Sequence, residues 1–159
     1  MLDEDRDEAE RVFAASDRSS GLVVLPERRR LDDGSGVYEK GLIDFVKDLR
    51  AEGITVAWAD APERRAFIEK RSAAEVIWGA ALGVPGGVLS AATWAALVRW
   101  FGRSPQSTGR VRVEVLREKS HPDGTTTREW MTYEGTGAEV AELMQADPPT
   151  ALQSKSSEV

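Results

Sequence analysis

The hydrophobic pattern of the first third of the chain alternates between strand-like and helix-like segments. Residues 21–25 form a short apolar run that Pro26 ends, which is typical of a buried strand. Over residues 37–52, apolar positions recur at helical spacing, and Gly53 offers the left-handed residue that ends many helices. Residues 54–58 are a second apolar run. Together these segments predict a β-α-β unit with two parallel strands.

Polar segments and turn residues divide the rest of the chain. The stretch 27–36 holds three consecutive arginines and several glycines, so we expect an exposed loop. Asp60, with Pro62 and Glu63 soon after it, predicts a short charged helix to about Arg71. Alternating residues in 111–115 and 125–134 flank a Pro-Asp-Gly turn, which indicates a β-hairpin.

The C-terminal residues and the overall pattern complete the expected architecture. Residues 137–144 read as a short helix and residues 147–159 as a flexible tail. We therefore predict an α+β two-layer sandwich with a mixed sheet of about four strands, built as one domain over residues 21–146. Residues 1–20 are expected to be an acidic extension, either solvated or docked onto the domain or a basic partner.

An uncharged span of 23 residues, 76–98, is the most unusual feature of the sequence. Pro85-Gly86-Gly87 in its middle favours two short helices, 73–84 and 88–101, packed against the sheet. As a single transmembrane helix, the span would rise about 34 Å and could cross a bilayer core of about 30 Å. A re-entrant hairpin is the other membrane arrangement. A partner-binding surface is a third explanation.

Small and aromatic residues make the Gly/Ala-rich segment 73–101 the candidate interaction site. Glycines at four-residue spacing on one helix face would let another backbone approach closely, and the aromatic residues would add contact area. The interaction residues predicted on this basis are Gly79, Gly83, Gly87, Trp94, Trp100 and Phe101. The expected contacts are self-association, a protein partner or a membrane.

Composition and charge exclude several classes of chemistry. The 159 residues contain no cysteine and a single histidine, His121, so thiolate chemistry and multi-histidine metal sites are excluded. The net charge of −6 argues against broad nucleic-acid binding, which depends on Lys and Arg contacts to phosphates. The remaining polar residues form no recognisable catalytic arrangement. We therefore expect no enzymatic activity, no cofactor and no metal site.

Two further expectations concern location and nucleotides. The acidic start lacks the basic and apolar regions of a signal peptide, which predicts a cytoplasmic protein, with membrane contact confined to the inner face of the plasma membrane. The glycines of 34–36 lie where α/β proteins often bind phosphate, so a nucleotide-linked α/β protein is an alternative. However, Leu42-Ile43 replaces the Lys-Ser/Thr pair that a phosphate-binding loop requires after Gly41.

Several short motifs stand out within the predicted order of elements: Gly86-Gly87-Val88-Leu89, the stretch 95–101, the strand 111–115 and Pro122-Asp123-Gly124-Thr125. In these motifs and in the order of its elements, the chain resembles the effector-associated constant component family of bacterial conflict systems over about residues 21–145. The resemblance implies a non-catalytic accessory component encoded beside protease-like or other effectors, and it carries over no site residue. The function expected from the sequence is a non-enzymatic adaptor or accessory module, with a small membrane-anchored protein and the nucleotide-linked protein as alternatives.

Overall fold

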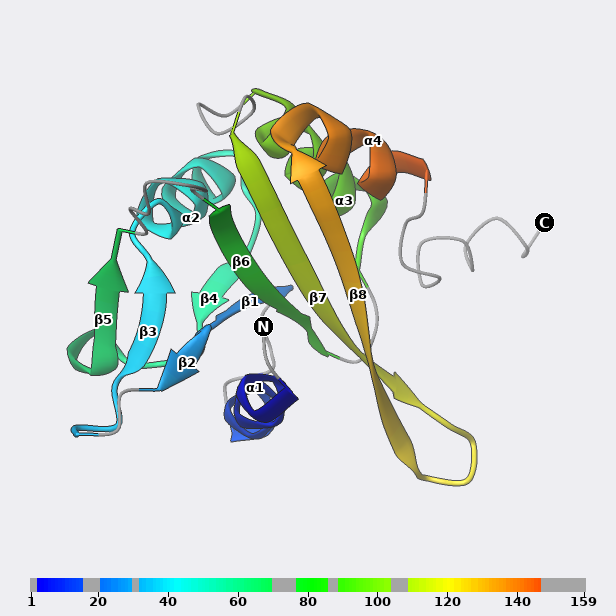
Figure 1. The fold of residues 1–159 in the computed structure, drawn as a ribbon. Helices are drawn as coiled ribbons and strands as arrows, with labels where there is room; N and C mark the ends of the chain where they lie inside the picture. Colours follow the sequence, from blue (N-terminus) through cyan, green and yellow to red (C-terminus); the bar gives the residue numbers. More distant parts are fainter. Residues whose placement is uncertain are drawn as a thin grey trace.

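The computed structural model describes residues 3–15, 21–29, 32–69, 77–85, 89–103 and 109–146. These residues form four α-helices, a mixed five-stranded sheet and a small three-stranded sheet, so the predicted α+β class is confirmed (Figure 1). The main sheet has the strand order β4-β1-β6-β7-β8, one strand more than we expected.

The N-terminal β-α-β unit is present with a shorter helix than predicted. The strands β1 (Leu22–Leu25) and β4 (Val56–Trp58) pair in parallel, and α2 (Leu42–Ala51) lies between them in the chain. Gly53 ends this helix with a φ of +84°, which favours glycine because other residues rarely adopt that conformation.

Three segments predicted as helix or loop form the strands of the small sheet instead. The strand β3 (Gly36–Glu39) replaces the expected first turn of the helix, and it pairs with β2 (Arg28–Arg29) and in parallel with β5 (Arg65–Ile68). The predicted charged helix shrinks to a single 3-10 turn, Pro62–Arg64. Both β3 and β5 contain adjacent aromatic and β-branched residues, which favour a strand once a pairing partner is near.

The described residues of the uncharged span form a strand followed by a helix. The strand β6 (Ile77–Val84) replaces the first predicted helix and lies between β1, to which it is antiparallel, and β7, to which it is parallel. A continuous apolar run suits a central strand as well as a buried helix, which is why periodicity misled here. The second predicted helix is confirmed as α3 (Ala91–Arg103), and the Oγ of Ser90 accepts a hydrogen bond from the N–H of Thr93 at 3.1 Å.

The predicted hairpin is confirmed, with longer strands than the alternation indicated. The strands β7 (Arg110–Ser120) and β8 (Thr126–Thr136) are joined by a tight turn in which Gly124 has a φ of +87°. Pairing of β6 with β7 ends at Arg117, so the hairpin projects beyond the rest of the sheet (Figure 1).

The predicted terminal helix is confirmed as α4 (Gly137–Ala146). A reciprocal pair of hydrogen bonds fixes its start. The N–H of Glu139 donates to Thr136 Oγ1 at 3.1 Å, and the N–H of Thr136 donates to Glu139 Oε1 at 3.2 Å. This arrangement satisfies two backbone groups that the helix itself leaves unpaired.

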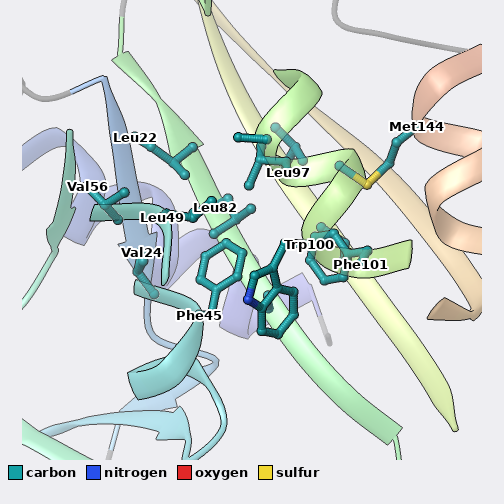
Figure 2. Close-up of a cluster of buried hydrophobic side chains, with 14 of the residues drawn as sticks. Leu22, Val24, Phe45, Leu49, Val56, Leu82, Leu97, Trp100, Phe101 and Met144 are labelled. Carbon is teal, nitrogen blue, oxygen red and sulfur yellow. The ribbon is translucent and has the colours of Figure 1, made fainter. Parts of the chain in front are cut away.

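The larger core lies between one face of the main sheet and the helices α2, α3 and α4. Side chains from all three helices meet side chains from the strands there (Figure 2), among them Leu22, Val24, Phe45, Leu49, Val56, Leu82, Leu97, Trp100, Phe101 and Met144. Burial of this apolar surface is the main favourable contribution to folding.

The acidic N-terminal segment is folded onto the other face of the main sheet. It forms α1 (Asp3–Ala15; Figure 1). This helix buries Ala9 and Phe13 in a smaller cluster together with Val23 of β1 and Leu116 of β7. Of the two expectations for this segment, docking onto the domain describes residues 3–15. The predicted tail, residues 147–159, lies outside the described residues.

Candidate functional site

One of the glycines predicted as a contact face, Gly83, lies against a helix of the same chain. Residues four apart in a strand share one face of the sheet, so Gly79 and Gly83 of β6 lie on the same face, with Ala81 between them. A Cβ atom added to Gly83 would lie 2.7 Å from ring atoms of Phe13 in α1. Glycine therefore does permit a close approach here, and what approaches is α1. Gly87 lies outside the described residues.

The three aromatic residues predicted for interaction lie in the larger core. Phe101 is fully buried, and Trp94 and Trp100 are 5% and 7% exposed. The indole N–H of Trp94 donates to the carbonyl of Met144 at 2.9 Å, and that of Trp100 donates to Asp48 Oδ2 at 3.0 Å. These contacts tie α3 to α4 and α2, so the side chains are occupied within the fold.

A chain of polar side chains links α1 to the small sheet. Arg29 Nε lies 2.8 Å from Glu8 Oε1, and Arg29 Nη2 lies 2.8 Å from Asp60 Oδ1. The buried hydroxyl of Tyr38 donates to Asp60 Oδ2 at 2.6 Å. Arg29, which we expected in a solvated loop, is therefore part of a structural network. No sequence motif indicates this network, because its side chains come from four separate segments of the chain.

The chemistry of this network is that of a structural contact. Burial, and next the hydrogen bond to Asp60, raise the pKa of Tyr38 well above its ordinary value, so its phenol stays protonated and acts as a donor. A side chain at Gly36 would collide with the Asp60 carboxylate. In a phosphate site, backbone N–H groups at the start of a helix bind the anion. Here the glycine loop is followed by a strand and lies beside a carboxylate, so it differs from a phosphate site.

The two edges of the main sheet differ sharply. At one edge, β4 has three residues, and the Arg50 side chain donates to the carbonyl of Val56 at 3.1 Å from Nε and 2.8 Å from Nη2. At the other edge, β8 has eleven residues, most of them exposed, and pairs only with β7 among the described strands. Natural sheets usually shorten or block their edges, as β4 does.

The hairpin register determines which backbone groups of β8 face outward. The N–H of His121 donates to the carbonyl of Thr125 at 2.8 Å, which makes these residues a hydrogen-bonded pair. Such pairs alternate along an antiparallel ladder, so Arg128, Trp130 and Thr132 direct their N–H and C=O groups away from β7. His121 itself is a turn residue, as expected, and its Nε2 lies 2.9 Å from Thr127 Oγ1.

Contacts with α1 hold the middle of β8 in place. The guanidinium of Arg6 lies 5.5 Å from the ring centroid of Trp130, and its Nη2 lies 2.7 Å from Glu114 Oε1 on β7. The indole N–H of Trp130 donates to Glu10 Oε1 at 3.1 Å. The outer edge of β8 is thus both exposed and fixed in an extended conformation. Sequence analysis located the hairpin and placed its second strand over 125–134, close to the bounds of β8, but it did not identify β8 as an edge strand, because a local pattern does not report strand order.

Comparisons with protein-family models, with curated proteins and with solved structures find no match. Within the part of the chain that the structure describes, no group of three or more acidic or histidine side chains is arranged to hold a metal ion. The described helices include none that is both long and apolar enough to cross a membrane. Residues 77–84 form a strand, so they are not part of a continuous transmembrane helix.

Proposed function

We propose that the chain is a non-enzymatic accessory or adaptor module that binds a protein by strand addition at the outer edge of β8. The observation that carries this proposal is the contrast between the two sheet edges: β4 is short and blocked by Arg50, whereas β8 has eleven residues, six of them exposed. An extended segment added to such an edge gains a row of backbone hydrogen bonds.

Side chains along the edge supply specificity for the added strand. Arg128, Thr132 and Glu134 are exposed and lie on one face of β8, at alternating positions. Charged pairs across neighbouring strands favour one partner and one register over others. The edge is also held in place by β7 over its whole length, which lowers the entropy cost of binding.

The resemblance to effector-associated constant components supports an accessory role, and it suggests a bacterial conflict system as the setting. The contact surface proposed here is the β8 edge rather than the Gly/Ala-rich segment, since Trp94, Trp100 and Phe101 are buried in the core.

A photo-crosslinking amino acid at Thr132 tests the proposal directly. The full chain carrying this group is expressed together with the proteins encoded beside it. Lys47, exposed on α2, is the matched control position. We expect a discrete cross-linked product from position 132 and none from position 47. The proposal fails if position 132 yields no product with a neighbouring protein or with a second copy, while circular dichroism shows that the labelled chain is folded.

A further inference from the structure

We propose that the strand accepted by the β8 edge is the β8 edge of a second copy, paired antiparallel around Met131. This inference rests on the proposed function, because it requires the same edge to accept a strand. The two five-stranded sheets would then join into one continuous sheet across a two-fold axis, the commonest symmetry of soluble oligomers.

Charge complementarity selects this pairing. Arg128 and Glu134 are each three residues from Met131, so an antiparallel pair centred on Met131 places Arg128 of each copy opposite Glu134 of the other. Both side chains are on the same face of β8, because they are an even number of residues apart. The two-fold axis makes this contact twice. Opposite charges directly across two strands stabilise their pairing.

The neighbouring strands extend each of these contacts into a row of alternating charge. Arg128 Nη2 already lies 3.4 Å from Glu118 Oε2 on β7, and Glu134 Oε1 lies 3.0 Å from Arg110 Nη2. Across the joined edge, the order becomes Glu118, Arg128, Glu134 of the second copy and Arg110 of the second copy. Each of the two inner charges, Arg128 and Glu134 of the second copy, thus has an opposite charge on both sides, and none of the existing pairs is broken.

Other registers lack this match. The outward backbone groups belong to even-numbered residues, so the pairing can slip only in ways that keep even residues opposite one another. Centring on Trp130 places Arg128 opposite Thr132, and centring on Thr132 places it opposite Thr136. Centring on Arg128 brings two arginines together, which is destabilising. The Met131 register also sets two half-buried methionines side by side.

Sedimentation equilibrium of the full chain, from about 1 to 200 µM, tests the inference with two charge variants. Arg128→Glu leaves two glutamates facing each other in both contacts, and Glu134→Arg leaves two arginines. We expect each variant alone to associate about tenfold or more weakly than the wild-type chain. An equimolar mixture of the two variants restores both opposite-charge pairs, so it should form a heterodimer. Lys47→Glu on α2 makes the same change of charge as Arg128→Glu away from the edge and should have no effect.

A backbone variant tests the pairing without altering charge. Thr132→Pro removes an outward N–H and spares the ladder to β7, so it should abolish the dimer and leave the circular dichroism spectrum unchanged. A monomeric wild-type chain, or a dimer that the charge variants leave intact, overturns self-pairing. If position 132 still cross-links to another protein in that case, the proposed function stands. If it does not, both proposals are wrong.

Discussion

The two faces of the main sheet are closed in different ways. On one face, Leu22, Leu82 and other large apolar side chains pack against three helices. On the other, the smaller apolar cluster lies beneath α1, whose Phe13 packs over Gly83 and whose Glu8 and Arg6 form ion pairs. The first face is covered by the close packing of large apolar side chains. The packing on the second face depends on the absence of a side chain at Gly83 and on surface electrostatics. Substitutions on the two faces should therefore destabilise the protein in different ways.

The largest effect is expected on the three-helix face. Phe101→Ala removes a fully buried aromatic ring that contacts Phe45 and Trp100, and it should lower the free energy of unfolding by about 3–5 kcal/mol. Denaturant titration followed by circular dichroism measures this change. A loss below about 1 kcal/mol would show that this face is not the main source of stability.

A smaller and local effect is expected on the α1 face. Gly83→Val places methyl groups where the Phe13 ring lies, so α1 should detach at a cost of about 1–3 kcal/mol. Hydrogen exchange should show the loss of protection in α1 while β7 and β8 stay protected. Phe13→Ala removes the ring that the new side chain of Gly83→Val would meet, so the two substitutions act on one contact. The double variant should therefore lose less stability than the sum of the two single losses. Additive effects would mean that the ring does not depend on Gly83.

The polar network that links α1 to the small sheet should affect stability in alkaline solution. The pKa of Tyr38 is raised in the folded chain, so the protonated phenol stabilises the fold fully below its unfolded pKa of about 10, and this stabilisation is lost as the pH rises further. Tyr38→Phe should cost about 1 kcal/mol at pH 7 through the lost hydrogen bond to Asp60. The variant should also lose stability less steeply than wild type above pH 10, as measured by urea titration at several pH values. Equal slopes for the variant and the wild type would show that ionisation of the Tyr38 phenol does not contribute to the loss of stability at high pH.

The smallest effect is expected from Glu8→Gln. Glu8 is partly exposed and pairs with Arg29 and Arg11, so its replacement should weaken α1 docking by about 0.3–1 kcal/mol, and added salt should reduce the difference. Amide exchange in α1 at low and high salt measures this effect. A salt-independent change would point to packing rather than charge.

Local patterns were enough to predict the elements whose neighbours are close in sequence. The hairpin around Gly124, the helix after Thr136 and the parallel unit that ends beyond Gly53 were all predictable from turn residues and alternation. The strands β3, β5 and β6 were not, because a pairing partner decided their conformation. For Ile77–Val84 in particular, a buried strand and a buried helix share the same composition.

The candidate site was predictable only in part. The importance of Gly83 followed from glycine spacing, because a period of four matches one face of a strand as well as one face of a helix. What Gly83 contacts depends on where α1 folds back, and no local pattern reports that. The β8 edge likewise depends on strand order: Arg128 and Glu134 become edge residues only because β7 occupies a single side of β8.

The order of strands also has a consequence for how the chain reaches its fold. The elements from β6 to α4 follow one another in sequence and in space, and such local contacts form quickly. By contrast, Leu25 of β1 pairs with Ala81, and α1 packs over Gly83, so both must wait for β6. Refolding should therefore begin in the C-terminal half. During synthesis the N-terminal half appears first, and β1 then has an unfilled edge until the ribosome has delivered β6.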